Sequence, residues 1–172
     1  VDDESMDNSI EIVEYIMKGN NKIRLIKNSK NKGTYYCKNL ALQTINEKTK
    51  YIAFQDSDDY SHCERIRKQI EVLYLTNSKL SVTLCERYNI LRFACISQVY
   101  DIEIFNKLGY FDNSRFGADS EYLYRFFKLH NINLTGNYNY NKGSIFNNNF
   151  SIHYCIPHKM YFINNNDDTC LS

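Results

Sequence analysis

The sequence of 172 residues has no tryptophan, a single proline at Pro157 and no strong excess of charge of either sign. Its 21 Lys and Arg residues face 20 Asp and Glu residues, so the formal net charge is +1. A protein that binds nucleic acid through a broad basic face needs a larger positive excess, and the balance argues against that class. No apolar run approaches the roughly 20 residues that span a bilayer. We therefore expect a soluble protein without a transmembrane segment in this chain.

The six cysteines lie singly along the chain, without a Cys-x-x-Cys pair or a histidine at zinc-finger spacing. Structural zinc is therefore not expected. A chain of this length buries roughly two thirds of the surface that its unfolded form exposes, so it can sustain a core without disulfides. Reduced, buried thiols are the favoured interpretation. We predict a cytoplasmic location and leave open an association with a membrane through partners or segments outside this chain.

The first half of the chain alternates helical and extended patterns. Helical spacing of apolar residues occupies residues 8–19, an extended pattern follows at 22–27, and a second helix is predicted over 34–46. The apolar run Tyr51–Phe54 is typical of a strand buried on both faces. A capping box that starts at Ser61 predicts the next helix. Strands that alternate with helices predict an α/β fold, with a mainly parallel central sheet flanked by helices.

The second half has a different pattern. Strands are predicted over residues 80–85 and 91–99, joined by a turn near Tyr88, and helices over 102–108 and 118–129. In the second of these helices, Tyr122, Phe126 and Leu129 are in phase and are expected on one inner face. The last 40 residues are rich in Asn and Tyr and are predicted to form loop or tail. No linker or internal repeat divides the sequence. We therefore expect a single domain with two functional halves.

Three carboxylates follow directly after the predicted strand Tyr51–Phe54, at Asp56, Asp58 and Asp59. Mutual repulsion makes such a cluster unfavourable unless a cation compensates it. Hard carboxylate oxygens select Mg²⁺ or Mn²⁺, and a diphosphate can supply the remaining ligands. The alternative is a solvated turn in which one Asp caps the next helix, although Ser61 is better suited to that position. Both interpretations stay open on these residues alone.

Four segments with characteristic residues occur in order along the chain. They are Val1-Asp2-Asp3-x-Ser5-x-Asp7, then Asn31-x-Gly33-Thr34-Tyr35 with Lys38-Asn39-x-Ala41-Leu42, then Tyr51–Asp59 leading to Glu64-Arg65 and Gln69, and finally Leu108-Gly109-x-Phe111-Asp112 leading to Ala118-Asp119-Ser120-Glu121 and Arg125. Together, over about residues 1–130, they resemble the motifs of family 2 glycosyltransferases with the GT-A fold. The resemblance implies a Rossmann-like nucleotide-sugar-binding half over about residues 1–78, an acceptor and catalytic half over about 79–155, and a tail over about 156–172.

The resemblance also implies which residues bind a nucleotide diphosphate sugar, with a uridine nucleotide expected. Asp3 is the expected partner of the base, and Asp2 is a second candidate. The further donor-binding residues that it implies are Asn31, Gly33, Lys38, Asp56 and Asp58. For Gly33, a turn at the entry of a helix explains the residue equally well. Asp58 is expected to hold a Mn²⁺ or Mg²⁺ ion that bridges the phosphates, with Asp56 supporting the metal or the ribose.

For catalysis, the resemblance implies that Asp119 is the general base of an inverting transfer to a hydroxyl of a glycan, lipid or protein acceptor. Glu121 is a competing candidate, and Asp119 as a partner of the helix dipole stays open. Arg125 is predicted either to approach phosphate or to form a surface ion pair. His153 is a further candidate metal ligand, although a lone histidine more often has a structural role.

The prediction is thus a metal-dependent glycosyltransferase of the hexosyltransferase type. One alternative is a degenerate relative that binds a nucleotide or a partner without turnover. This alternative is suggested by the start of the chain, because the first strand and helix of the family are expected before Val1. A nucleotidyltransferase is less favoured, since the sequence lacks the Gly-rich loop with a basic residue that such an enzyme needs near its start.

Overall fold

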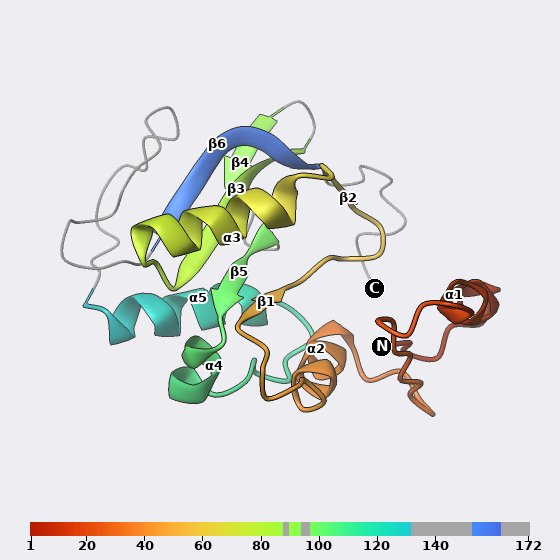
Figure 1. Ribbon diagram of the computed structural model, residues 1–172. Coiled ribbons are helices and arrows are strands. Elements are labelled where there is room, and N and C mark those ends of the chain that lie inside the picture. Colours follow the sequence, from red (N-terminus) through yellow and green to blue (C-terminus); the bar gives the residue numbers. More distant parts are fainter. Residues whose placement is uncertain (88–89, 94–96, 132–152, 163–172) are drawn as a thin grey trace. The chain divides into compact units, whose positions relative to one another are not determined.

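The structure is a computed structural model that describes residues 1–87, 90–93, 97–131 and 153–162, with side chains described over 1–83 and 97–131 (Figure 1). The described chain forms two compact units. The first comprises residues 1–47 and 110–118, and the second comprises residues 48–109 together with those after 118. This structural division does not coincide with the functional boundary expected near residue 78.

The first unit contains helices α1 (Ser9–Met17) and α2 (Thr34–Leu42). The strand expected over residues 22–27 is wrong except at its end, where Lys27 forms an isolated parallel bridge with Asp2. The Asp2 amide donates to the Ile26 carbonyl at 2.8 Å, and the Asn28 amide donates to the Asp2 carbonyl at 2.9 Å. Pairing stops there because Glu4 has a φ of 70°, which turns the chain out of the extended conformation.

Helix α2 is shorter than predicted, and its buried face attaches a distant segment to the first unit. Cys37, Asn39 and Leu42 are its buried residues. The Asn39 side chain donates to the Phe111 carbonyl at 2.9 Å and accepts from the Phe111 amide at 3.0 Å. This pair of bonds imitates backbone pairing. It explains why residues 110–118 group with the first 47 residues of the chain.

Among the described residues, the second unit contains a six-stranded sheet and three helices, the last of which begins at the boundary with the first unit (Figure 1). Its strands are β1 (Tyr51–Ala53), β2 (Tyr60–Ser61), β3 (Leu80–Arg87), β4 (Ile90–Phe93), β5 (Val99–Asp101) and β6 (His153–Phe162). They lie in the order β1-β5-β3-β6-β2, with β4 paired to β3. The helices are α3 (Arg65–Thr76), α4 (Glu103–Leu108) and α5 (Ala118–Leu129).

Strand direction in this sheet differs from the prediction. The sheet was expected to be mainly parallel, but only β3 and β6 pair in parallel among its described strands. The connection between β3 and β4 is too short for a parallel crossover, which needs a dozen or more residues, so these strands must run antiparallel. The predicted turn near Tyr88 and the Asn-rich segments at 147–149 and 164–166 lie outside the described residues.

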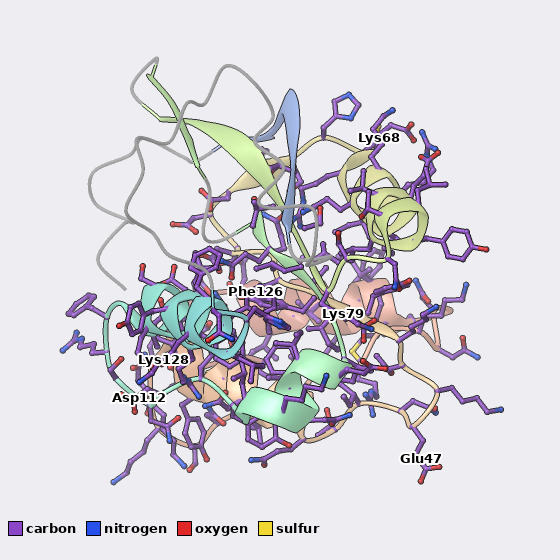
Figure 2. The ribbon with its side chains drawn as sticks, turned by 90° about the vertical axis from the view of Figure 1, so that its left-hand side faces the viewer. Glu47, Lys68, Lys79, Asp112, Phe126 and Lys128 are labelled. Carbon is purple, nitrogen blue, oxygen red and sulfur yellow. The ribbon has the colours of Figure 1, made fainter. Side chains whose placement is uncertain are left out.

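Aromatic side chains form the core between α4, α5 and strand β5. The rings of Phe105 and Tyr122 stack with centroids 5.2 Å apart, and Tyr100 meets Tyr122 edge to face at 5.7 Å. Tyr122 and Phe126 have no exposed surface, which confirms the predicted inner face of α5. Leu129 was expected on that face but is 44% exposed. Figure 2 labels the buried Phe126 and the exposed Lys128 on this helix.

The described helices are short or mixed in polarity. None of those within the described ranges has the length and apolar character needed to cross a membrane. This finding agrees with the absence of a long apolar run in the sequence.

Candidate functional site

Asp3 is the centre of a hydrogen-bonded cluster in the first unit. Its carboxylate accepts from the Lys32 amide at 2.9 Å, from the Gly33 amide at 2.7 Å and from the Asn28 side chain at 2.7 Å. A carboxylate has about four acceptor positions, so these bonds use most of them. Asp3 thus connects the loop 28–33 to the N-terminal segment. Its expected contact with the base of a nucleotide stays a prediction.

Two other candidates lie beside Asp3. The Asn31 side chain donates to the Asp3 carbonyl at 3.2 Å, and the Asn31 amide donates to the Glu4 carboxylate at 2.9 Å. The Asp2 carboxylate accepts from the Ser5 amide at 3.3 Å. The structure therefore brings Asp2, Asp3, Asn31 and Gly33 together in the first unit, and their binding of a nucleotide stays a prediction.

Gly33 ends this loop and precedes the first residue of α2. Its φ of 89° lies in the region that favours glycine, which supports the interpretation of Gly33 as a helix-entry turn. Lys38 lies one turn further along α2, where its ammonium is 5.5 Å from the ring centre of Tyr35. Lys38 is half-buried, so its position is set by packing as well as by charge.

Burial and hydrogen bonding act in opposite directions on the Asp3 carboxylate. Burial is the largest single influence and raises its pKa, but bonds from Asn28, Lys32, Gly33 and Cys37 together outweigh it and lower the pKa below 3.8. For the Cys37 thiol, burial first and then Asp3 raise the pKa to about 11. Cys37 is therefore a protonated donor at neutral pH. It is free and buried, as predicted for the cysteines, whereas Cys63 is free but exposed.

The acidic turn, defined as residues 56–59, follows β1 in the second unit. The Asp59 amide donates to the Asp56 carbonyl at 3.3 Å, which closes the turn. The Gln55 side chain donates to the carbonyls of Asp56 at 3.0 Å and of Asp59 at 2.9 Å. Asp56 and Asp58 are half-buried. A single glutamine therefore holds both ends of the segment that carries the predicted metal ligands.

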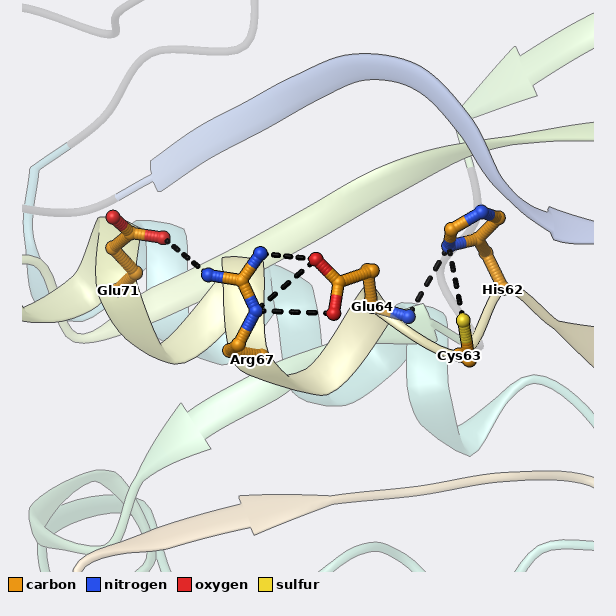
Figure 3. A network of polar contacts seen from close by, with 5 residues as sticks. All are labelled: His62, Cys63, Glu64, Arg67 and Glu71. Atoms are coloured by element: carbon orange, nitrogen blue, oxygen red, sulfur yellow. Dashed lines mark hydrogen bonds and ion pairs between the residues drawn. The ribbon is translucent and has the colours of Figure 1, made fainter.

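The predicted capping role of Ser61 is wrong. Ser61 lies in the short strand β2, and its hydroxyl donates to the Gln55 side chain instead of meeting a helix amide. Helix α3 begins only at Arg65, and the Glu64 amide that precedes it donates to the His62 ring nitrogen Nδ1 at 3.1 Å (Figure 3). The pairing of β2 with β6 keeps Ser61 extended, which prevents it from starting the helix.

The acidic turn fits a metal site that shares its ligands with a bound phosphate, and it does not fit a site made of protein ligands alone. Within the described ranges, no three His, Cys, Asp or Glu side chains gather closely enough to form a metal cage. Mg²⁺ is commonly bound by one or two carboxylates and by the phosphates of a substrate instead. Asp56 and Asp58, both half-buried in one tight turn, fit that second arrangement. They could hold a metal bound to a phosphate, and this role stays a prediction.

Helix α5 carries the predicted general base in its first turn. The Asp119 carboxylate accepts from the Ser120 amide at 2.8 Å and is half-buried. Glu121 instead pairs with Arg125 one turn later, at 2.8 Å between Oε1 and Nε. This contact is the ion pair that was one of the two predictions for Arg125. Arg125 also donates to the Leu108 carbonyl at 2.9 Å. Glu121 is therefore engaged by a cation, and the role of Asp119 as the general base stays a prediction.

His153 is the first residue of β6 and pairs with Leu80 in the sheet. Its side chain lies outside the described residues, so its role as a metal ligand stays a prediction. Two residues that organise these segments were not predicted from the sequence: Asn28, which donates to Asp3, and Gln55, which holds the acidic turn. Gln55 stands within the third characteristic segment, next to Asp56, and that position was the available signal.

Several solved structures share the fold of this chain. A crystal structure of S. aureus TarS 1-349 has a TM-score of 0.66 and 16% identity, over 94% of this chain and 49% of that chain. The complex of the same protein with UDP has a TM-score of 0.66 and 15% identity, over 94% and 48% of the two chains. The complex with UDP-GlcNAc gives 0.64 and 17%, over 94% and 47%. The likeness shows an α/β fold of the GT-A type.

The chain thus spans about half the length of these solved structures. No curated protein sequence matches it. The model of the family described as Glycosyl transferase family 2 matches residues 1–164. The chain therefore belongs to glycosyl transferase family 2, which confirms the family that its four characteristic segments indicated.

Proposed function

We propose that the protein transfers a sugar from a nucleotide diphosphate sugar to the hydroxyl of an acceptor. The observation that carries this proposal is the family match over residues 1–164. TarS, a structural neighbour, has been solved with UDP and with UDP-GlcNAc. These complexes support a uridine diphosphate sugar as the donor.

The acidic turn and the Asp3 cluster supply the residues for donor binding. Asp56 and Asp58 would hold Mn²⁺ or Mg²⁺ on the diphosphate, an arrangement that uses few protein ligands. When bound, such an ion would neutralise the charge that develops on the nucleoside diphosphate as it leaves. In the first unit, the loop 28–33 has its shape fixed by Asp3. Asp2, Asn31 and Lys38 are the further candidates for contact with the nucleotide.

Asp119 would act as the general base. Its carboxylate takes the proton from the acceptor hydroxyl while the oxygen attacks the anomeric carbon and the bond to the diphosphate breaks. Attack from the side opposite the leaving group inverts the anomeric configuration. The position of Asp119 in the first turn of a 12-residue helix keeps its carboxylate on a rigid element. Glu121 is less suited because its carboxylate already pairs with Arg125.

The proposal is tested by measuring nucleotide release from a panel of UDP sugars, with Mn²⁺ or Mg²⁺ and with simple acceptor sugars. We expect release of UDP from at least one donor, and release that requires the divalent ion. Glu47→Gln is a matched control, because Glu47 is exposed and lies outside all four characteristic segments (Figure 2). This variant should release UDP at the wild-type rate.

Two outcomes would contradict the proposal in different ways. Binding of a UDP sugar without transfer or hydrolysis would favour the degenerate relative that binds a nucleotide without turnover. Failure to bind any member of the panel, or free UDP, would remove the donor assignment as well.

A further inference from the structure

Arg65 is the largest fully buried side chain among the described residues, with 2% of its surface exposed. It is the first residue of α3. Its Nη2 donates to the Phe54 carbonyl at 3.0 Å and to Gln55 Oε1 at 3.3 Å, while its Nη1 donates to the Ser97 carbonyl at 3.2 Å and to Gln69 Oε1 at 3.3 Å. The guanidinium thus connects α3 to the end of β1 and to the segment before β5.

Gln69 makes this connection rigid. It has no exposed surface, and its amide donates to the Ser97 carbonyl at 2.8 Å and to the Ser81 carbonyl at 3.1 Å. Burying a guanidinium is unfavourable unless oxygen atoms replace its water. The oxygens around Arg65 come from two backbone carbonyls, from Gln69, which is itself held, and from Gln55, so the guanidinium has little freedom to move.

The effect of Arg65 on Gln55 follows from the chemistry of the two groups. A guanidinium has five donors and no acceptor, so Gln55 must turn its oxygen, not its nitrogen, toward Arg65. The Ser61 hydroxyl donates to the same oxygen. The Gln55 amide nitrogen then points the other way, where it donates to the carbonyls of Asp56 and Asp59. Arg65 therefore determines that the nitrogen of the Gln55 amide, and not its oxygen, is directed toward the acidic turn.

We propose that Arg65 is a positioning residue for the acidic turn: by fixing the Gln55 amide, it holds Asp56 and Asp58 in the geometry that binds a metal on a nucleoside diphosphate. The metal and the nucleoside diphosphate named here rest on the proposed function, whereas the effect of Arg65 on the conformation of the turn does not. Arg65 contacts no ligand itself. Its contribution is to remove the alternative conformations of the turn before the ligand arrives, which lowers the entropic cost of binding.

Two variants interrupt the connection at different points. Arg65→Lys keeps the charge but loses the fork, whose Nη2 reaches Phe54 and Gln55 while its Nη1 reaches the segment before β5. Gln55→Leu leaves the bonds of Arg65 to the Phe54 and Ser97 carbonyls and removes the link to the turn. The matched control is Arg67→Met on the same helix, because Arg67 is exposed and pairs only with its neighbours Glu64 and Glu71 among the described residues (Figure 3).

Two measurements are made on each full-length variant, alongside its free energy of unfolding. The first is hydrogen exchange of the backbone amides of residues 56–59 without ligand. The second is the affinity for Mn²⁺ in the presence of UDP, followed by the electron paramagnetic resonance signal of free Mn²⁺. We expect faster exchange in both variants and Mn²⁺ affinity that falls about 10- to 100-fold, the usual effect of losing a residue that supports a metal ligand. Arg67→Met should match the wild type in both measurements.

The proposal is overturned if Gln55→Leu and Arg65→Lys show wild-type exchange and wild-type Mn²⁺ affinity. If Arg65→Lys does not fold, Gln55→Leu decides, because the Gln55 side chain is exposed and its loss leaves the buried network in place. If the wild-type chain binds no Mn²⁺ with UDP, the proposed function fails. The exchange of the turn amides then still decides whether Arg65 positions the turn.

Discussion

The variant Asp119→Asn is expected to lower kcat by about 10²- to 10⁴-fold, the usual contribution of a general base. Asparagine has nearly the same shape as aspartate but cannot take a proton from an acceptor hydroxyl. Its side-chain oxygen can still accept from the Ser120 amide, which the Asp119 carboxylate meets at 2.8 Å. The first turn of α5 should therefore stay intact. Affinity for UDP should be unchanged, since the loss concerns the chemical step.

The control for Asp119→Asn is Glu121→Gln on the same helical turn. This change weakens the ion pair with Arg125, whose partner Glu121 is exposed, and pairs of this kind contribute only about 0.3–0.5 kcal/mol. Steady-state transfer rates and UDP binding by calorimetry are measured for both variants. If Asp119→Asn retains full transfer while Glu121→Gln loses it, the base is Glu121 and our assignment is wrong.

The variant Asp3→Asn is expected to reduce the free energy of unfolding by about 1.5–3 kcal/mol, the range for a lost hydrogen bond to a charged group. An amide nitrogen in place of one carboxylate oxygen would face the amide hydrogens of Lys32 or Gly33, which are donors themselves. The loop 28–33 should loosen as a result. Urea denaturation measures the change, and Asp2→Asn is the control, because Asp2 accepts the longer 3.3 Å bond from Ser5.

Acid gives a second test of Asp3. Its pKa in the folded chain is lowered below 3.8, since hydrogen bonds to the ionised form outweigh the opposing effect of burial. The ionised carboxylate therefore stabilises the fold above pH 3.8, and this contribution is lost as the pH falls through the lowered pKa. The difference in stability between wild type and Asp3→Asn should shrink on acidification below that pH. A difference that stays constant with pH would contradict the assigned role of Asp3.

Local sequence patterns predicted the helices better than the strands. The bounds of α5 follow from its amphipathic spacing and match the prediction, because that spacing is a local property. The extended pattern at 22–27 forms a single bridge, since a strand also needs a partner and Glu4 turns the partner away. Strand β6 was not predicted, because its pairing with β3 joins residues more than 70 positions apart in the sequence.

The same limit applies to the candidate site. The carboxylates of the acidic turn were identified because three acids in four residues are conspicuous in a sequence. The residues that support these carboxylates were not identified. Gln55 and Arg65 have no distinctive local pattern, and their role arises only when folding brings the start of α3 against the end of β1. For Ser61, the local pattern predicted a helix cap that does not form. Its strand pairs with β6 instead, and its hydroxyl donates to Gln55.

The most direct test of the account is the affinity for UDP with Mn²⁺ and with a chelator, measured for the wild type and for Asp58→Asn. If Asp58 holds the metal on the diphosphate, Mn²⁺ should strengthen UDP binding to the wild type, and Asp58→Asn should lose this gain. The loss should exceed about tenfold, because removing even a residue that supports a metal ligand costs about 10- to 100-fold. Equal UDP affinity in Mn²⁺ and chelator for the wild type, or an undiminished gain in Asp58→Asn, would contradict the account.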